Sequence, residues 1–596
     1  MKNELLWPFD AAYLQKNKKR IRRELLLDKT KRIVKRIAIL GGSTTDEIKD
    51  MMELFLLNNG IEPLFYQSDF NKYWEDVMFD NAELKEFGPD IIFIHTSMRN
   101  ISYKVDMSLS TEQIDDLLNA EYQRFEIMWN KISETYGCVI IQNNFDYNFF
   151  RLLGNKDIYD LHGMNNFLAK LNEKFYSFAQ KNENFFINDL NWMQSYFGIN
   201  IFSDPKYWYL YKYIVAVPLI PYFAFNVVNI IKSIYGKNKK ALVLDLDNTL
   251  WGGVIGDDGI EGIQIGHETS MGQAYNEFQS YIKNHLQLGI MLAVNSKNDE
   301  ENAIAGLNHP EGTLKPDDFI VIKANWEPKS LNLKRIASSI NIGEDSLVFV
   351  DDNPAEREIC YQNNPFTVSP NIGQVTDYIR NLDMSGFFET TIFSIDDLKR
   401  NEMYKSNVKR AELEASFDNY DEYLKSLNMK AVVREFDDIY LPRIAQLTNK
   451  SNQFNLTTKR FSDADIKIAS NDKDRICLYG KLSDKFGDNG VITVVIGRKE
   501  NADILGIELW LMSCRVLKRG MENAMLDSLV KCAKKRGYSK LKGYYFKTEK
   551  NNMVRFFYRD FGFTLLEENE NLDSIWELDI REYKNKNLFI EVTENE

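Results

Sequence analysis

The chain has 596 residues, of which 44% are hydrophobic and 27% are charged, and its formal net charge is −13 at pH 7. This length exceeds what one hydrophobic core supports, so we expect three or four domains of about 150 residues each. The composition excludes extended disorder, and the acidic balance argues against a nucleic-acid partner, because binding to phosphate backbones needs a concentrated basic surface.

Targeting and membrane signals point to a protein that stays inside the cell. The five cysteines are widely spaced, which argues against a disulfide framework, and the N-terminus has no basic segment followed by an apolar one. The uncharged stretch 213–231 is long enough to span a membrane, but Pro218 and Pro221 interrupt it. Asn226 and Asn229 would also be costly in lipid. We therefore predict a buried helix pair, no membrane span and a reducing, cytoplasmic location.

The first predicted elements form an α/β domain with a parallel sheet. A basic stretch, 16–23, indicates a solvated helix face or, alternatively, a docking patch for an acidic partner. Strand-like runs follow at 37–40, 91–94 and 139–141. Segments of helix length separate them, which is the spacing of a parallel sheet.

A serine follows the first of these strands. The run Gly41-Gly-Ser-Thr-Thr45 resembles the nucleophile block of SGNH-type esterases, which makes Ser43 the candidate nucleophile. That family needs Asp-x-x-His near its end, whereas Asp204 is followed by tyrosine at the histidine position. A serine without a base is a poor nucleophile, so we expect a structural or carrier-docking role for this domain. Asn143 and Asn144 line a pocket or, equally, form a turn.

The next elements predict a second α/β unit. The polar segment 236–240 leads into an apolar run, 241–244, where a new strand starts. Helical spacing of hydrophobic residues returns at 275–286 and at 333–340. Asp245 and Asp247 follow the apolar run, at the end of the strand where open α/β folds hold ligands. At this spacing one carboxylate can attack a phosphoryl group while the other protonates the leaving oxygen.

Three further signals follow in the order that a phosphoryl-transfer site requires. Ser296 comes after another predicted strand and offers a hydroxyl group to a phosphate oxygen. Lys329 begins a helix and supplies a fixed positive charge. Asp351 and Asp352 close a third strand and offer the oxygen ligands that Mg²⁺ prefers. The predicted metal ligands are Asp245, Asp247, Asp351 and Asp352, and the predicted phosphate-binding residues are Ser296, Asn298 and Lys329.

Together these signals resemble the haloacid dehalogenase (HAD) superfamily, subfamily IIIC, and the run 245–253 is similar to the branch found in FkbH-like proteins. The resemblance implies a Mg²⁺-dependent phosphatase with Asp245 as nucleophile and Asp247 as acid/base. About 45 residues separate Asp247 from Ser296, too few for a large cap domain. We therefore expect a minimal cap and an open site, which suits a phosphoryl group carried on something bulky.

The last third of the chain predicts an α+β domain. A charged helical stretch, 395–413, leads to strands at 491–496 and 504–510 and to a helix at 521–536. This order resembles the N-acetyltransferase-like (GNAT) fold. Glu522 stands where that family has a small residue beside a pyrophosphate, and its charge would repel phosphate, so ordinary acetyl-coenzyme A use is not expected.

Two polar features of this region have alternative interpretations. Cys514 lies beside Arg515, and cationic neighbours lower the pKa of a thiol, so Cys514 is either an acyl relay or a buried inert cysteine. The segment 448–457 is rich in amides and hydroxyls. It is either a loop or a segment that contacts a glyceryl group or a phosphopantetheine arm.

With 448–457 and 512–516, the resemblance to FkbH-like proteins covers the whole chain. It implies a multidomain α/β protein with an SGNH-like α/β domain (1–236), a HAD-like Rossmannoid domain with a minimal cap (237–385) and a GNAT-like α+β domain (386–596). The implied activity is loading: the glycolytic acyl phosphate 1,3-bisphosphoglycerate loses phosphate, and its glyceryl or a similar hydroxyacyl group passes to the phosphopantetheine thiol of an acyl carrier protein.

Two other functions stay open. One is a Mg²⁺-dependent HAD phosphatase that acts on a sugar or small phosphate, with flanking domains that serve assembly only. The other is a scaffold or a simple acyl transferase in which the phosphatase site is vestigial.

Overall fold

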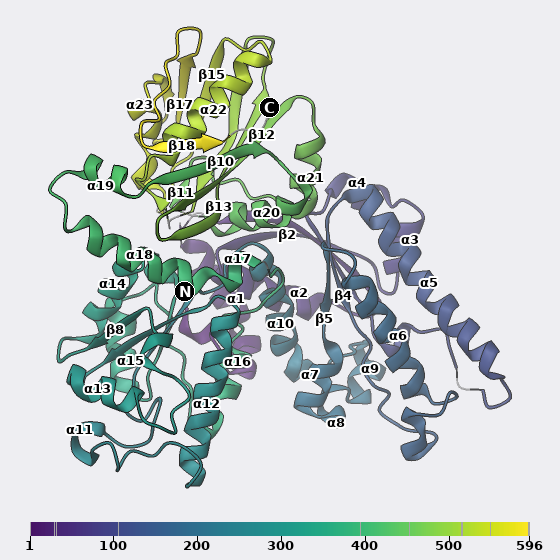
Figure 1. Cartoon of the computed structure of the whole chain (residues 1–596). Coiled ribbons are helices and arrows are strands. Elements are labelled where there is room, and N and C mark those ends of the chain that lie inside the picture. Colours follow the sequence, from purple (N-terminus) through teal and green to yellow (C-terminus); the bar gives the residue numbers. More distant parts are fainter. Residues whose placement is uncertain are drawn as a thin grey trace. The chain divides into compact units, whose positions relative to one another are not determined.

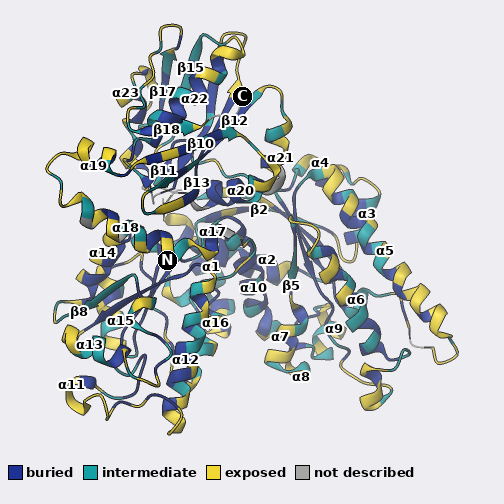
Figure 2. Cartoon of the chain, in the orientation of Figure 1, coloured by how far each residue is buried: buried dark blue, intermediate teal, exposed yellow. Residues whose placement is uncertain are grey.

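The computed structural model of the chain describes residues 2–28, 30, 32–104, 106–393, 395–451, 453–513, 516–548 and 550–593. The chain divides into two compact units, Met1–Ser233 and Ile234–Glu596, and the described residues form three β-sheets in a mixed α/β, multidomain fold (Figure 1). The strands are mostly buried, and exposed residues gather on the outer faces of the helices (Figure 2). The predicted domain boundaries at 236 and 385 stay predictions.

The first unit contains a five-stranded parallel sheet with the strand order β2-β1-β3-β4-β5. Its strands are β1 (Ile33–Gly41), β2 (Ile61–Gln67), β3 (Ile91–His95), β4 (Val139–Asn143) and β5 (Phe185–Asn188). The runs predicted at 37–40, 91–94 and 139–141 lie in β1, β3 and β4. Neither β5 nor β2, which Pro63 interrupts, was predicted.

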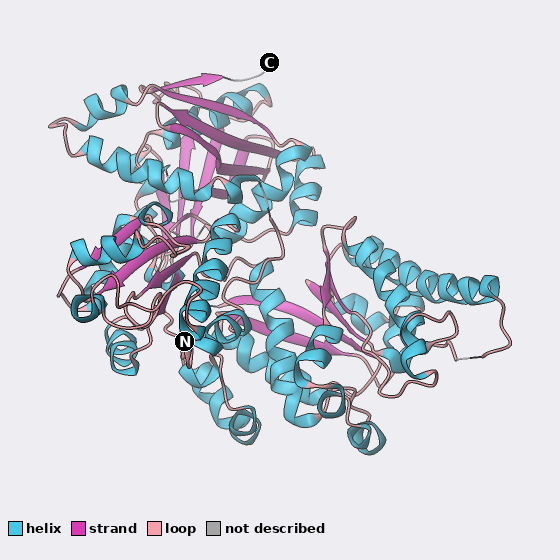
Figure 3. Ribbon diagram, turned by 60° about the horizontal axis from the view of Figure 1, so that its bottom comes forward, coloured by secondary structure: helices cyan, strands magenta, loops and turns pink. Residues whose placement is uncertain are grey.

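Helices cover both faces of this sheet, since consecutive residues of β1 from Ile37 to Leu40 are all fully buried. The helices are α1 (Ala11–Leu27), α2 (Asp46–Asn58), α3 (Tyr73–Met78), α4 (Ala82–Phe87), α5 (Thr111–Tyr136), α6 (Met164–Ala179), α7 (Leu190–Phe197), α8 (Ile199–Phe202), α9 (Pro205–Tyr211) and α10 (Ile220–Ile234). Figure 3 shows these helices (cyan) around the strands (magenta).

The apolar stretch near residue 220 forms one helix, so the predicted helix pair was wrong. Pro218 lies in a single 3₁₀ turn, and Pro221 lies in the first turn of α10, where a missing N–H costs little. Within the described residues, the stretch Val217–Ile234 is the one helical segment long and apolar enough to cross a membrane, and most of it is buried.

The second unit begins with a four-stranded parallel sheet of order β8-β7-β6-β9. Its strands are β6 (Ala241–Leu244), β7 (Met291–Ser296), β8 (Val321–Ala324) and β9 (Leu347–Val350), and its helices are α11 (Ile255–Asp258), α12 (Ser270–Gln287), α13 (Glu300–Leu307), α14 (Lys329–Ser339), α15 (Pro354–Asn363) and α16 (Tyr378–Met384). Leu244 of β6 pairs with Val294 of β7 and with Val350 of β9. The residues that follow these positions therefore meet at one edge of the sheet.

The rest of this unit is a nine-stranded mixed sheet of order β16-β17-β15-β14-β13-β12-β10-β18, in which β11 also pairs with β14. Its strands are β10 (Met429–Glu435), β11 (Phe454–Asn455), β12 (Arg475–Asp484), β13 (Gly487–Lys499), β14 (Ile504–Met512), β15 (Lys540–Tyr545), β16 (Thr564–Glu568), β17 (Ser574–Asp579) and β18 (Ile590–Thr593). The helices are α17 (Ile395–Leu398), α18 (Arg400–Glu414), α19 (Tyr420–Ser426), α20 (Leu441–Lys450), α21 (Asp463–Asn471), α22 (Met521–Lys535) and α23 (Phe557–Asp560). The helix predicted at 521–536 matches α22 to within one residue.

Candidate active site

Three carboxylates meet at the edge of the four-stranded sheet. Asp245 follows β6, and Asp351 and Asp352 follow the neighbouring strand β9. One oxygen from each of the three lies within 4.8 Å of the others. The Asp245 N–H donates to Val350 O at 2.9 Å, which extends the pairing of β6 and β9 into the site and fixes this juxtaposition.

Lys329 faces two of these carboxylates from the first turn of α14. Its Nζ lies 2.7 Å from Asp245 Oδ2 and 2.7 Å from Asp351 Oδ2, and the residue is only 4% exposed. Burial lowers the pKa of Lys329, but the charges of Asp245 and Asp351 outweigh burial and keep the pKa above its ordinary value. Lys329 is therefore a permanent cation in the site. The side chain of Asn295 holds the start of this helix by donating to Lys329 O at 3.0 Å.

The carboxylates carry more negative charge than Lys329 neutralises. The pKa of Asp351 is raised to about 6, first by burial and then by the charge of Asp245, while Lys329 opposes the shift. Burial and then Asp245 also raise the pKa of Asp352. Such a cluster of oxygen ligands with excess negative charge fits Mg²⁺. The residues that would hold the ion are Asp245, Asp351 and Asp352.

Asp247 lies beside the cluster but points elsewhere. Its Oδ1 accepts from Trp251 Nε1 at 2.9 Å and from Ile255 N at 3.1 Å, and its Oδ2 accepts from Asn298 Nδ2 at 3.1 Å. Burial raises the pKa of Asp247, and the bonds from Ile255 and Trp251 oppose that shift. Asp247 therefore lies outside the group of three carboxylates that share one small space. Its roles as acid/base and as metal ligand stay predictions.

Two residues of the site were missed in the sequence. Trp251 donates to Asp247, and the Thr249 hydroxyl accepts from the Asp352 N–H at 3.2 Å, which ties the loop after β6 to the loop after β9. Both lie in the run 245–253 that carried the resemblance. Position within that run was the only signal for them, because neither side chain carries a carboxylate or an ammonium group.

The predicted phosphate-binding residues lie at the same edge of the sheet. Ser296 ends β7, one residue beyond Asn295, and is 2% exposed. Asn298 follows in the next loop and contacts Asp247 directly. Their predicted roles stay predictions, but both are positioned beside the carboxylates by the pairing of β6 with β7.

The segment between β6 and the long helix α12 is small. Gly252 and Gln264 exchange two backbone hydrogen bonds of 3.0 and 2.8 Å, which close a short flap, and α11 has four residues. Tyr275 and Tyr378 donate to Asn248 O at 3.4 and 2.9 Å and hold the chain just before the flap. The flap is the minimal cap that was expected.

The serine candidate of the first unit has a different setting. Ser43 is 2% exposed, and within the described residues its hydroxyl has no hydrogen-bond partner. Asn143 is occupied: its Nδ2 lies 3.0 Å from His95 Nδ1, and its Oδ1 accepts from Asn188. Asp204 caps α9 by accepting from Lys206 N. These bonds do not join Ser43, Asn143 and Asp204 into one constellation.

His95 was also missed, and it does not supply the absent base. It ends β3, where it pairs with Gly41 of β1. Burial lowers the pKa of His95 to about 3, so the ring is neutral. Asn143 occupies Nδ1, and the ring packs against Phe223 with 5.0 Å between centroids. His95 is therefore part of a buried polar network.

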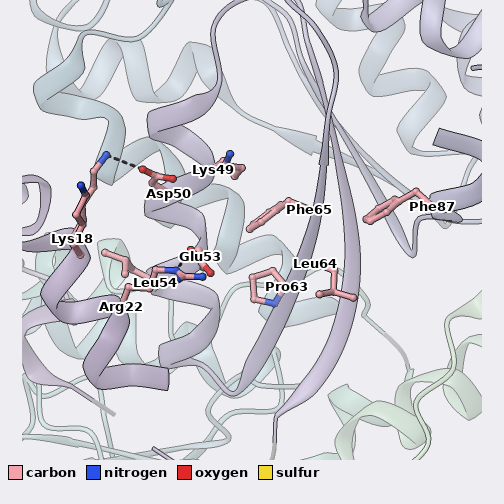
Figure 4. Close-up of a pocket in the computed structure, with 11 residues that line it drawn as sticks. Lys18, Arg22, Lys49, Asp50, Glu53, Leu54, Pro63, Leu64, Phe65 and Phe87 are labelled. Atoms are coloured by element: carbon pink, nitrogen blue, oxygen red, sulfur yellow. Dashed lines mark hydrogen bonds and ion pairs between the residues drawn. The ribbon is translucent and has the colours of Figure 1, made fainter. Parts of the chain in front are cut away.

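The basic stretch 16–23 forms part of α1 and borders a pocket of about 700 Å³ with α2 and β2 (Figure 4). Lys18 Nζ lies 2.7 Å from Glu47 Oε2 and 2.8 Å from Asp50 Oδ2. Arg22 pairs with Glu53 at 2.7 Å. The acids of α2 thus pair with two of the six basic residues of the stretch, Lys18 and Arg22. A docking role for it stays a prediction.

Two sequence candidates of the third region remain. Cys514 lies outside the described residues, so its role as a relay stays a prediction. The segment 448–457 is divided between the end of α20 and the strand β11, and its Thr448, Asn449 and Asn455 side chains are buried and bonded to the chain's own backbone. It is thus mainly a structural segment.

The comparisons agree with this geometry. Residues 36–232 match the family FkbH, N-terminal domain. The crystal structure of the N-terminal part of protein BF1531 from Bacteroides fragilis, which contains a phosphatase domain complexed with Mg, is 30% identical, with a TM-score of 0.59, and covers 63% of this chain and 99% of that chain. No curated protein matches the chain.

Two acetyltransferase structures also align over part of the chain. The GNAT domain of S. lividans PAT is 18% identical and covers 25% of this chain and 89% of that chain, with a TM-score of 0.21. The ribosomal-protein-S18-alanine N-acetyltransferase from Escherichia coli is 16% identical and covers 27% and 99%, with a TM-score of 0.20.

The four-stranded sheet with its carboxylates, lysine and minimal cap defines a HAD-type phosphatase domain, and the 30% identical relative was crystallised with Mg. The match of residues 36–232 to the FkbH N-terminal domain completes the assignment. The chain belongs to the FkbH family.

Proposed function

We propose that the protein is a loading enzyme. It takes a phosphorylated three-carbon acyl phosphate, 1,3-bisphosphoglycerate, removes phosphate with its HAD-type site, and passes the glyceryl or a similar hydroxyacyl group to the phosphopantetheine thiol of an acyl carrier protein. The observation that carries the phosphatase half is the placement of Lys329 at 2.7 Å from both Asp245 and Asp351. The loading half rests on membership of the FkbH family.

In the phosphatase step, Asp245 attacks phosphorus, and the bond between phosphorus and the substrate oxygen breaks. Asp247 gives its proton to the departing oxygen and then takes one from the water that hydrolyses the aspartyl phosphate. Lys329 holds the phosphoryl oxygens and the Asp245 carboxylate in place. Bound Mg²⁺ supplies further positive charge to the phosphoryl group.

In the transfer step, the thiol of the carrier attacks the carbonyl carbon of the acyl phosphate. The bond from that carbon to the phosphate oxygen breaks, inorganic phosphate leaves, and a thioester forms. An acyl phosphate is already activated for this attack, so the site of Asp245 needs to remove only the remaining phosphate ester. The small size of the flap supports a phosphorylated group delivered on a bulky carrier.

Intact mass spectrometry tests the proposal. A cognate holo-acyl carrier protein is incubated with the full chain, Mg²⁺ and 1,3-bisphosphoglycerate, beside an Asp245→Asn variant. We expect a glyceryl mass gain on the carrier with the wild type, and no gain or a phosphoglyceryl gain with the variant. No gain on the carrier under any condition refutes loading.

The second candidate is a phosphatase that acts on a sugar or another small phosphate without a carrier. One observation favours it. Every charged group described in the site lies between β6 and the second residue after β9, so one segment of the chain supplies them all. Phosphate release by the wild type but not by Asp245→Asn, with an unmodified carrier, would establish this function instead.

A further inference from the structure

Strands β14 and β15 of the nine-stranded sheet run parallel but pair only at their starts. The ladder joins Ile504–Gly506 to residues 540–542 and then stops, although β14 continues to Met512 and β15 to Tyr545. Beyond that point the facing edges of both strands carry N–H and C=O groups that need partners. A gap of this kind accepts an extended chain that carries amides, because such a chain can bond to both edges.

A segment of the protein fills this gap. Phe454 and Asn455 form β11 and pair with the end of β14, and Leu456 N donates to Trp510 O at 3.0 Å. On the opposite side Leu456 O accepts from the N–H of Phe546, directly after β15, at 2.9 Å. Residues 454–457 are at most 4% exposed. The segment therefore replaces the missing ladder and leaves little room there for another extended chain.

A second group of the chain occupies the start of α22, which follows β14. Lys518 and Gly520 have φ values of 64° and 81°, a left-handed backbone that turns the N–H groups toward Glu522. Lys518 N donates to Glu522 Oε1 at 3.3 Å. Burial raises the pKa of Glu522, and backbone hydrogen bonds from Glu522, Lys518 and Gly520 oppose the shift. The carboxylate thus takes the backbone donors that a helix start would otherwise offer to a phosphate.

These two observations concern one ligand chemistry, that of an amide-bearing arm joined to a diphosphate, as in coenzyme A. The gap between the strands would hold the arm, and the start of α22 would hold the diphosphate. Here segment 454–457 fills the first place and the Glu522 carboxylate fills the second. A diphosphate at the second place would also lie against the partly buried carboxylate of Glu522.

We propose that Glu522 is a specificity-determining residue that excludes coenzyme A and its thioesters from the C-terminal domain, so that acyl groups do not leave the enzyme on the free coenzyme. The identity of the acceptor that is used, a carrier-borne thiol, rests on the proposed function. The exclusion itself does not, because it concerns only the coenzyme and the residues that block it.

Isothermal titration of the full chain with coenzyme A, in EDTA and without Mg²⁺, tests the exclusion. Glu522→Gln keeps the size of the side chain and removes its charge, and Glu522→Gly also empties the space. We expect no saturable binding by the wild type up to millimolar coenzyme A. Segment 454–457 still fills the gap in both variants, so they open only the place of the diphosphate. We expect that this alone gives at least tenfold tighter binding by both variants. Glu570→Gln, which changes an exposed carboxylate of the same domain, is the matched control and stays like the wild type.

Thermal melts of all four proteins check that the variants are folded. Micromolar binding of coenzyme A by the wild type overturns the proposal. So does the failure of folded Glu522→Gln and Glu522→Gly to bind more tightly than Glu570→Gln.

A competition between holo-carrier and coenzyme A, with 1,3-bisphosphoglycerate and Mg²⁺, separates the two hypotheses. The wild type should label the carrier alone, and Glu522→Gln should label both. Absence of label on the carrier counts against the loading function, whereas the titrations still decide the role of Glu522. Label on coenzyme A with the wild type counts against the exclusion even when loading is intact.

Discussion

Replacing Lys329 with methionine tests how much the buried charge cluster depends on one cation. The variant keeps an unbranched side chain but removes the ammonium group that lies 2.7 Å from both Asp245 and Asp351. Leaving buried carboxylates without their partner costs about 3–5 kcal/mol. For a domain of about 150 residues, this lowers Tm by roughly 6–20 °C. Phosphatase activity should fall by about 10²- to 10³-fold, the usual effect of losing one charge-stabilising group.

Differential scanning calorimetry in EDTA, with and without added Mg²⁺, measures the shift. Mg²⁺ should restore part of the stability of Lys329→Met, because the ion supplies positive charge to the same oxygens. Lys297→Met is the matched control, since Lys297 is 41% exposed in its side chain and pairs with Glu356 at the surface. It should cost less than about 1 kcal/mol. A loss no larger than that of the control, or one that Mg²⁺ leaves unchanged, refutes this account of the cluster.

The same cluster predicts a pH dependence in metal-free protein. The pKa of Asp351 is raised to about 6 in the folded state and is about 3.9 in an unfolded chain, so the folded state binds more protons between these values. This contribution to stability is present below about pH 4 and is lost as the pH rises through about 6. The difference in Tm between the wild type and Asp351→Asn, followed from pH 4 to 7 in EDTA, should therefore change in that window. A constant difference contradicts the shift.

Three other results are expected. Trp251→Phe removes the 2.9 Å hydrogen bond to Asp247. A hydrogen bond to a charged group contributes about 1.5–3 kcal/mol, so kcat for phosphate release should fall by about 10- to 100-fold. An unchanged kcat means that Asp247 does not need this hydrogen bond. Ser43→Ala should leave phosphatase activity unchanged and should not lower the Tm of the first unit, because the buried hydroxyl makes no hydrogen bond that would be lost. Loss of an esterase activity in that variant would show a working serine. Burial lowers the pKa of His95 to about 3, so the first unit should lose stability as the pH falls below about 6.5. In His95→Gln, the Tm of the first unit should depend less on pH in this range.

The sequence was most informative where chemistry and strand ends coincide. Asp245, Asp351 and Lys329 could be placed together because parallel strands bring their carboxyl ends to one edge. The orientation of Asp247 could not be predicted. It depends on Asn248, whose φ of 55° turns the chain so that Trp251 and the Ile255 N–H face the carboxylate. A short sequence pattern does not encode such a turn.

Pairing between strands that are far apart in the sequence could not be predicted either. Segment 448–457 has the composition of a loop, and nothing within it indicates that Phe454 and Asn455 pair with Leu511 and Met512. That pairing depends on the divergence of β14 from β15, which is a property of the whole sheet. For the same reason β2, an edge strand that contains Pro63, gave no strand signal of its own.

The pairing of β6 with β9 also sets an order of events during synthesis. At about 5–20 residues per second, the ribosome adds Asp351 roughly 5–20 seconds after Asp245. In this interval the nascent chain has its nucleophile but neither Asp351 nor Asp352. Since the three carboxylates form the cluster together, Mg²⁺ cannot nucleate the early part of this domain. It can only stabilise a sheet that hydrophobic packing and backbone pairing have already completed.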